Sequence, residues 1–252
     1  MTTPIFPTGT PVVVPLESAG ATAAVGPGAQ LARLLEGRIV VLSAVEDPHE
    51  VAGRRAEIAA SEAVASLGDD ARIEVVADPF AENAIAARRD AVVCMATSAN
   101  ALHLDGYLGS MAEKVVRVTG RPTVLIGPSC VTADAFVVTR VVLTDDGSPT
   151  AAAARPVATE LATLLEAAVE TVTVATGGAE PTSADVTVLD GDDVPKAVLA
   201  HAGDDAVIVI ATRGRRGIRR LLGGSTTARI VRDARRPVVV VDGRAPDRGD
   251  PS

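Results

Sequence analysis

The sequence predicts an α/β fold in which two copies of a doubly wound, five-stranded parallel sheet follow one another along the chain. Three observations predict it. Short apolar runs alternate with helical stretches, as in parallel sheets covered by helices. The same order of runs occurs twice in the 252 residues. With three Phe, one Tyr and no Trp, the core must consist of Val, Leu, Ile and Ala, which is common where strands are buried on both faces.

The repeat is visible in four pairs of segments. The pairs are 11–19 with 141–149, 40–45 with 172–176, 91–99 with 206–214, and 108–127 with 223–242. From Ala96 to Gly127 the offset to the second copy is a constant 115 residues, and in the second pair we align Ala44 with Ala175. The repeat predicts two domains, 1–130 and 131–252, with a turn-rich boundary near 128–137.

Each copy is predicted to run strand, helix, strand, helix or loop, strand, helix, strand, glycine loop, helix and strand. In the first copy, residues 49–70 have the length and composition of a helix. The second copy has only turn formers, TGGAEPTSAD, at residues 176–185, so its helix is shortened to a loop. We expect the chain ends, 1–10 and 243–252, to be frayed.

Composition and charge exclude several classes of protein. The formal net charge of -8 disfavours general nucleic-acid binding. Two cysteines build neither a disulfide framework nor a four-cysteine zinc site. There is no apolar run of about 18 residues and no basic leader, so we expect a cytoplasmic protein without membrane contact. Isolated histidines and the lack of a nucleophile triad predict no metal site and no catalytic residue.

The most informative segment runs from Ala211 to Ser225, between an apolar strand and a helix. Its glycines, including Gly214 and Gly224, let the backbone approach a ligand closely. Ser225 or Thr226 is placed to cap the following helix, whose N-terminus suits phosphate. The loop lacks the Gly-Lys-Ser/Thr of a Walker P-loop and the G-x-G-x-x-G of a dinucleotide fold. On pattern alone, a plain strand-to-helix connection with a solvated basic face stays open.

The charge around this loop differs from that of the rest of the chain. Between Arg213 and Arg236 there are nine arginines and one acid, Asp233, although the whole chain is acidic. Arginines neutralise a triphosphate and can bind it bidentately. The segment therefore indicates a phosphate-binding loop.

The pattern small-x2-Gly-x9-Gly-Ser, followed by a helix and Pro-Val-Val-Val, resembles the signature of the universal stress protein family. The opening strand, which ends in Asp146-Gly147-Ser148, resembles it too. The likeness covers nearly the whole chain, twice, as in tandem members of the family. It implies a Rossmann-like fold of the HUP type with five parallel strands in each copy, the two copies forming a pseudo-two-fold pair. In many members it also implies ATP binding.

Carried over by position, the resemblance implies one ATP site in the second copy. Asp146 should meet the adenosine, with Thr144 nearby, and Ala175 should line the adenine pocket. The residues expected at the ribose and phosphates are Ala211, Gly214, Gly224, Ser225 and Thr226. Mg²⁺ should accompany the phosphates, although no residue specifies it. Ala211 replaces a motif glycine, and its small methyl predicts modest interference.

The first copy departs further from the family pattern. Ala96 and Ala99 replace the two leading glycines, Glu17 replaces the aspartate, and Asp105 adds a carboxylate to the loop. An alanine at positive φ costs about 1 kcal/mol, and a carboxylate repels phosphate. We expect the first copy to bind ATP weakly or not at all and to act as a structural partner.

The last strand of each copy, residues 122–126 and 237–242, begins with Pro and is strongly apolar. An exposed apolar edge invites pairing. The resemblance implies that such strands pair antiparallel between two domains. We therefore expect an intrachain pseudo-dimer, and a homodimer of whole chains stays open.

The favoured hypothesis is an ATP-binding stress-response protein that acts as a sensor or regulator through an unknown protein partner. It is expected not to be an enzyme, although slow ATP hydrolysis stays open. One alternative is a stress-protein interaction module that binds no nucleotide. The other is an adenylyl transferase of the HUP class, but the chain lacks a HIGH-like motif and an N-terminal SGGxDS-like loop.

Overall fold

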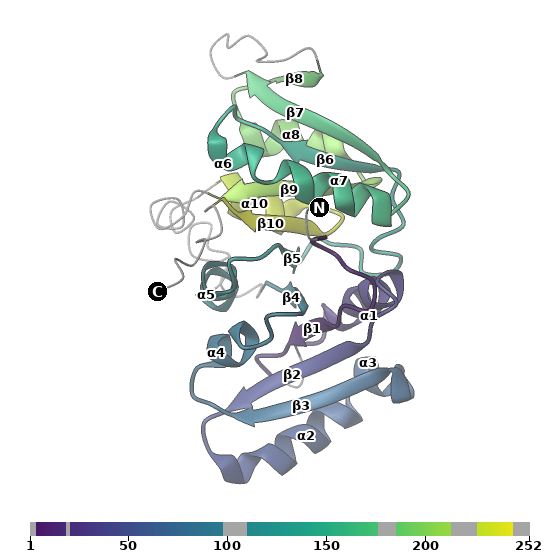
Figure 1. The fold of residues 1–252 in the computed structure, drawn as a ribbon, viewed down its shortest axis with the longest axis vertical. Coiled ribbons are helices and arrows are strands. Elements are labelled where there is room, and N and C mark those ends of the chain that lie inside the picture. Colours follow the sequence, from purple (N-terminus) through teal and green to yellow (C-terminus); the bar gives the residue numbers. More distant parts are fainter. Residues whose placement is uncertain (1–3, 19–20, 98–109, 176–184, 213–225, 244–252) are drawn as a thin grey trace.

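The computed structural model describes residues 4–18, 21–97, 110–175, 185–212 and 226–243. In this part of the chain the strands form one sheet of ten, with helices on both faces (Figure 1). The strand order is β3-β2-β1-β4-β5-β10-β9-β6-β7-β8. The predicted α/β class is confirmed, and the two five-stranded sheets are joined edge to edge into a single sheet.

The N-terminal half holds the first five strands. Its elements are β1 Val12–Pro15, α1 Val25–Leu34, β2 Ile39–Val45, the 3-10 turn Pro48–Glu50, α2 Val51–Ala60, α3 Glu62–Ala65, the 3-10 turn Gly68–Asp70, β3 Ala71–Ala77, α4 Ala81–Ala86, β4 Val92–Ala96, α5 Ser110–Thr119 and β5 Thr123–Ile126.

The C-terminal half holds the other five strands. Its elements are β6 Arg140–Thr144, α6 Pro149–Ala152, α7 Arg155–Leu164, β7 Ala168–Ala175, β8 Val186–Asp190, α8 Val194–Ala202, β9 Ala206–Thr212, α10 Thr226–Asp233 and β10 Val238–Asp242. Residues 127–139, between the halves, contain no helix or strand.

The two halves have the same strand order, because β3-β2-β1-β4-β5 is mirrored by β8-β7-β6-β9-β10. Within each half the paired strands are parallel. The halves meet where β5 and β10 pair antiparallel, with Val239 opposite Val124. This is the strand pairing that the resemblance implied.

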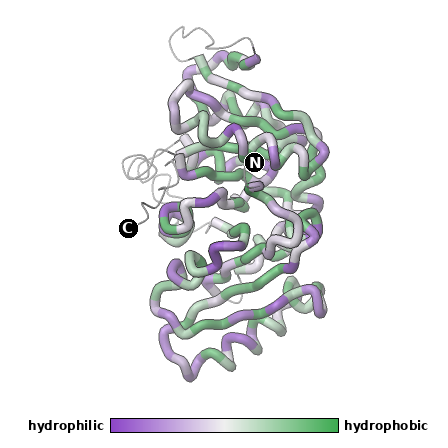
Figure 2. The backbone as a smooth tube through the Cα atoms, viewed as in Figure 1, coloured by the Kyte–Doolittle hydropathy of each residue, from purple (hydrophilic) through white to green (hydrophobic). Residues whose placement is uncertain are grey.

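The helices form two layers, and each layer packs on its own core. One core lies under α1, α2, α3 and α7, and includes the buried side chains Leu31, Ile58 and Leu161. The other lies under α4, α5, α8 and α10, and includes Ile85 and Ile230. Figure 2 shows hydrophobic residues along the central strands of both halves. The strands are therefore covered on both faces, as their continuous apolar runs predicted.

The prediction of one continuous helix over residues 49–70 is wrong. The chain interrupts it at Ser61, whose backbone is extended (φ -65°, ψ 134°). The Ser61 hydroxyl donates to the carbonyl of Ile58 at 2.7 Å. A serine that bonds to nearby backbone in this way competes with helix continuation. The segment is instead two short helices flanked by 3-10 turns.

The expectation that residues 1–10 are frayed is wrong for the described residues 4–10. The backbone N–H groups of Ile5 and Phe6 donate to Glu160 Oε2, at 2.6 and 3.2 Å, on α7 of the other half. Phe6 is 9 % exposed and belongs to the core under α7. The N-terminal segment therefore ties the two halves together through contacts 154 or more residues apart in sequence.

A second tie lies just beyond β5. A Cβ added at Gly127 would lie 1.8 Å from the carbonyl oxygen of Val231 on α10, so only glycine fits. Four residues on, the N–H of Val131 donates to the carbonyl of Arg235 at 2.9 Å. The end of α10 thus rests directly on the backbone that leaves the N-terminal half.

We expect Phe6→Ala to lower the free energy of unfolding by about 3 kcal/mol, because it empties a buried aromatic position. Chemical denaturation measures this change. The matched control is Phe80→Ala, which removes a ring that is 55 % exposed and should change stability little. Equal effects of the two substitutions would contradict the packed position of Phe6.

We expect Gly127→Ala to destabilise the protein or to separate the halves, because its Cβ has no room against Val231. Gly53→Ala is the control, since nothing lies within 4 Å of an added Cβ there and alanine favours the helix by about 0.5–1 kcal/mol. Thermal unfolding should move in opposite directions for the two variants. A neutral Gly127→Ala would show that the close approach is not needed.

Candidate functional site

A cavity of about 340 Å³ lies at the carboxyl edge of the sheet in the C-terminal half. It opens beside β6, whose two neighbours in the sheet are β7, the next strand along the chain, and β9, which the chain reaches from β8. This reversal of direction is the switch point at which open α/β sheets bind ligands. Its described lining residues are Thr144, Asp145, Asp146, Ser148, Thr150, Ala151, Val172, Thr173, Val174, Val194, Val198, Ile210, Ala211, Thr226, Thr227 and Ile230.

The turn after β6 brings two carboxylates to the cavity. Gly147 has a φ of 74°, a conformation that glycine adopts readily. This turn lets Asp145 Oδ1 accept from the N–H of Gly147 at 2.8 Å and Asp146 Oδ1 accept from the N–H of Ser148 at 3.1 Å. Asp145 also pairs with Arg155 at 3.1 Å. The local hydrogen bonds hold both carboxylates at the cavity wall.

Helix α10 begins at the cavity with Thr226, and the next residue, Thr227, also lines it. The first N–H groups of a helix have no partner within the helix and carry a partial positive charge. With two hydroxyls beside them, they form a donor-rich wall. Such a wall suits an anionic group such as phosphate.

Another part of the cavity lining is apolar. Val172 and Val174 come from β7, Val194 and Val198 from α8, and Ile230 from α10. These branched side chains form a slot beside the donor-rich wall. A ligand that fits both parts needs a flat or compact apolar body and an anionic group.

The structure brings four of the eight predicted site residues to this cavity: Thr144, Asp146, Ala211 and Thr226. Gly214, Gly224 and Ser225 lie outside the described residues.

The predicted place of Ala175 needs correction, because it is not among the described lining residues. The sheet register pairs Val12 with Ile39 in one half and Val141 with Val169 in the other. On this register the counterpart of Ala44 is Val174, not Ala175. A slip of one residue moves a strand side chain to the other face of the sheet.

Sequence reasoning also missed Asp145 and the apolar residues of β7 and α8. The doubled acid Asp145-Asp146 was a usable signal, since both residues follow an apolar strand. No sequence pattern predicts that Val194 and Val198 line the cavity, because their position there depends on how α8 packs against α10.

Helices α8 and α10 are tied by an ion pair next to the cavity. Asp193 Oδ1 accepts from the N–H of Lys196 at 3.1 Å and so caps α8. Its other oxygen accepts from Arg229 at 2.8 Å. The hydrogen bond from Arg229 and then that from Lys196 lower the pKa of Asp193. The pair therefore fixes the spacing of the two helices that form the apolar slot.

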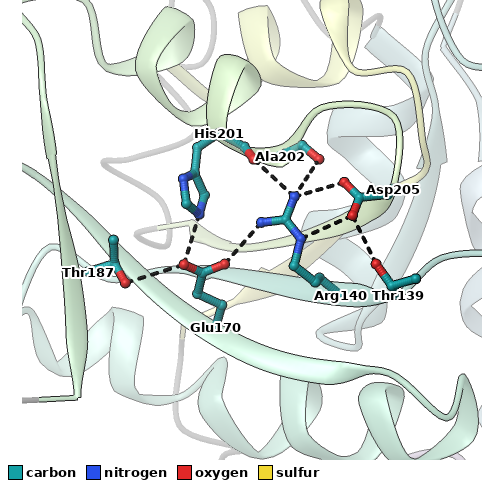
Figure 3. A network of polar contacts seen from close by, with 7 residues as sticks. All are labelled: Thr139, Arg140, Glu170, Thr187, His201, Ala202 and Asp205. Atoms are coloured by element: carbon teal, nitrogen blue, oxygen red, sulfur yellow. Dashed lines mark hydrogen bonds and ion pairs between the residues drawn. The ribbon is translucent and has the colours of Figure 1, made fainter.

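A separate polar cluster lies at the opposite, amino edge of the same sheet (Figure 3). Arg140 bonds to Asp205 at 2.8 and 3.2 Å and to Glu170 at 3.0 Å. It also donates to the carbonyls of His201 and Ala202 at the end of α8. A cation at a helix C-terminus is stabilising. The cluster therefore anchors α8 and satisfies its own charges, which is a structural role.

The acids of this cluster are held ionised. Hydrogen bonds from Arg140 and Thr139 lower the pKa of Asp205 to about 2. Burial opposes ionisation of Glu170, but His201, at 3.0 Å, and Arg140 outweigh it and keep its pKa below the ordinary value.

Neither cysteine has the properties of a reactive nucleophile. Cys94 and Cys130 are both free thiols. Burial raises the pKa of Cys130 to about 11 and raises that of buried Cys94 as well. A thiol protonated at neutral pH is a poor nucleophile. Among the described residues, no group of three or more His, Cys, Asp or Glu is arranged to hold a metal ion.

Comparisons with known proteins agree with this fold. Residues 133–242 match the model of the Universal stress protein family. A universal stress protein from Archaeoglobus fulgidus DSM 4304 is similar, with a TM-score of 0.67, 19 % identity, and coverage of 95 % of this chain and 98 % of that chain. A putative universal stress protein from Pseudomonas aeruginosa UCBPP-PA14 is also similar, with a TM-score of 0.60, 14 % identity, and coverage of 92 % of this chain and 93 % of that chain. The search of curated proteins found no match.

The doubly wound sheet with a cavity at its switch point defines a Rossmann-like α/β protein. Its C-terminal half, residues 133–242, belongs to the universal stress protein family, whose general role is in the stress response. The similar structures show that the fold extends over the N-terminal half. Within the described residues, no helix is long and apolar enough to cross a membrane.

We expect the stabilising effect of Asp205 to disappear in acid. Its folded-state pKa, about 2, lies below the ordinary value of 3.8, so its contribution is present above pH 3.8 and is lost as the pH falls towards 2. The difference in unfolding free energy between the wild type and Asp205→Asn should shrink over this range. Denaturation at several pH values measures it. Asp204→Asn, which removes a pairing with exposed Arg235, should cost less at neutral pH.

Proposed function

We propose that the C-terminal half binds ATP and that the protein acts in the stress response as a nucleotide-dependent sensor or regulator. One observation carries the proposal: the cavity joins an apolar slot to a donor-rich helix N-terminus. Its volume, about 340 Å³, falls within the roughly 300–1,000 Å³ usual for ligand sites. A nucleotide has an apolar ring that suits the slot and phosphates that suit the helix N-terminus.

The fit assigns each part of the nucleotide to a wall. The adenine lies in the slot of Val172, Val174 and Val198. The ribose hydroxyls reach Asp146, because a carboxylate accepts their hydrogen bonds. The phosphates meet the start of α10, where Thr226 donates. Gly214, Gly224 and Ser225 complete the phosphate loop in this proposal, and Mg²⁺ accompanies the phosphates.

The arginines divide into two groups. The four in the described part of this segment are engaged: Arg229 with Asp193, Arg232 with Asp233, Arg235 with Asp204, and Arg236 with two backbone carbonyls. We therefore assign neutralisation of the triphosphate charge to the arginines between residues 213 and 220. This division makes the loop, rather than α10, the source of ionic-strength dependence in ATP binding.

For the same site we propose regulation rather than catalysis. The cavity offers binding groups, and the cysteines and histidines of the described chain lie outside its lining. We propose that a nucleotide-dependent contact with a regulatory protein carries the signal. Because β5 and β10 pair with each other, a homodimer of whole chains has to use another surface.

Calorimetric titration with ATP and Mg²⁺ tests the proposal. We expect Thr226→Met to weaken ATP binding about tenfold or more, because it removes a hydrogen bond to a charged group and fills the mouth of the cavity. Gly214→Glu should abolish binding, since it places a carboxylate in the phosphate loop. The matched control is Met111→Thr, the reverse change at the equivalent position of the N-terminal half, which should leave ATP affinity unchanged.

Three outcomes would overturn the proposal. Absence of binding at millimolar ATP would favour the interaction module without nucleotide. Rapid turnover, or transfer of the adenylyl group to a second substrate, would favour an enzyme of the HUP class. Equal loss of affinity in Thr226→Met and Met111→Thr would place the site elsewhere.

A further inference from the structure

The described sheet ends in two strands that each have a single neighbour, β3 and β8 (Figure 1). An edge strand presents a row of unpaired backbone N–H and C=O groups that can pair with another chain. β3 is seven residues long, contains no proline or glycine, and pairs with β2 in an unbroken register from Ala71 to Ala77. It therefore lacks the proline and the bulge with which many edge strands prevent pairing.

The outward backbone groups of β3 can be identified from the residue that follows the strand. The N–H of Asp78 donates to the carbonyl of Val45 on β2 at 2.9 Å, so the backbone groups of Asp78 face β2. Because these groups alternate in direction along a strand, those of Ile73 and Val75 point away from β2. No other element of the described chain donates to them or accepts from them.

Helix α2 covers one face of β3 and leaves its edge accessible. Ile58 of α2 and Val75 of β3 are buried in the same core, so the helix lies on the face to which Val75 points. A second chain that approaches this end of the sheet meets few bulky side chains on the helix. Most of the exposed residues of α2 are small: Ala52, Gly53, Ala56, Ala59 and Ala60.

The charged side chains of β3 favour one kind of partner. Arg72 and Glu74 are two residues apart and therefore lie on the same face of the sheet. They pair with each other at 2.9 Å, and Arg88 also pairs with Glu74. The Arg72 side chain is 63 % exposed, and a guanidinium has enough donors for a second carboxylate. An edge with one charge of each sign can attract a copy of itself.

Charge and backbone direction together select one antiparallel register. When Ile73 lies opposite Ile73 of a second copy, the outward backbone groups of both strands meet, and Arg72 of each chain lies opposite Glu74 of the other. In the two neighbouring registers, Arg72 would oppose Arg72 or Glu74 would oppose Glu74, which is destabilising. β8 offers no such match to its own copy, because Asp190 is the one charged residue of that strand.

We propose that two copies of this chain form a homodimer by antiparallel pairing of their β3 edges. A two-fold axis at Ile73 relates the copies, so each edge is used once and the assembly closes. Arg72 then lies between the Glu74 carboxylates of both chains. The pairing gives whole chains a contact of their own, since β5 and β10 already pair within the chain. It does not depend on ATP binding by the C-terminal half.

Formation of a disulfide between chains tests the register. In the proposed dimer the two Ile73 Cα atoms form a hydrogen-bonded pair about 5.5 Å apart, which is within the range that a disulfide spans. We expect Ile73→Cys to give a covalent dimer when the full chain is mildly oxidised, and non-reducing electrophoresis detects it.

The matched control is Ala71→Cys. Ala71 lies opposite Val75 of the second copy in this register, so its two copies are about 14 Å apart along the strands and should give no covalent dimer. The wild type under the same conditions measures any cross-linking by the native thiols, Cys94 and Cys130.

Analytical ultracentrifugation tests the charge match. We expect the wild type to show a monomer–dimer equilibrium at micromolar concentration. Arg72→Glu should raise the dimer dissociation constant about tenfold or more, because two attractive pairs become repulsive. Arg121→Glu makes the same change in net charge at an exposed position before β5, away from β3, and should leave the constant unchanged. Circular dichroism checks that both variants are folded.

The proposal is wrong if the wild type stays monomeric at submillimolar concentration. It is also wrong if Arg72→Glu and Arg121→Glu weaken the dimer equally, since net charge rather than register then controls the association. A dimer in which Ile73→Cys cross-links no better than Ala71→Cys uses another surface. None of these results changes with the ability of the C-terminal half to bind ATP, so the two proposals fail independently.

Discussion

The antiparallel pairing of β5 with β10 is the contact on which the rest of the structure depends. It turns two five-stranded sheets into one and gives each half a covered edge where an apolar strand would otherwise invite aggregation. It also sets the distance at which α10 passes over Gly127, where a Cβ would lie 1.8 Å from the Val231 carbonyl. A larger residue there could not coexist with the strand pairing, so the two features support each other.

The same backbone frame carries two different cavities. In each half, the first strand of the sheet ends at the switch point, and the last helix begins beside it. Where that helix starts with Thr226, the cavity has a donor-rich wall. Where the counterpart is Met111, the side chain borders two separate cavities, of about 160 and 390 Å³. Backbone repetition fixes the place of a site, and a few side chains decide what it can hold.

The strands and their order of appearance could be predicted from the sequence, because apolar runs and turn formers are local signals. The position of Ala175 relative to the cavity could not be predicted, because the sequence match of Ala44 with Ala175 differs from the sheet register, in which Ala44 corresponds to Val174. The register becomes visible only when the neighbouring strand is in place. The break at Ser61 depends on one side-chain hydrogen bond. The packing of Phe6 depends on Glu160, which is 154 residues away. Such contacts leave no periodic pattern.

Comparison of the halves also separates structural features from ligand-specific ones. The ion pair of Asp193 with Arg229 lies beside the C-terminal cavity and could be taken for part of the ligand site. Yet Lys114, the counterpart of Arg229, pairs with Glu82 at 3.1 Å and so joins α4 to α5 in the other half, where Met111 stands in place of Thr226. A contact kept in both halves despite different cavities serves the packing of the helices. The side chains that differ between the halves, above all Met111 and Thr226, are therefore the ones that specify the ligand.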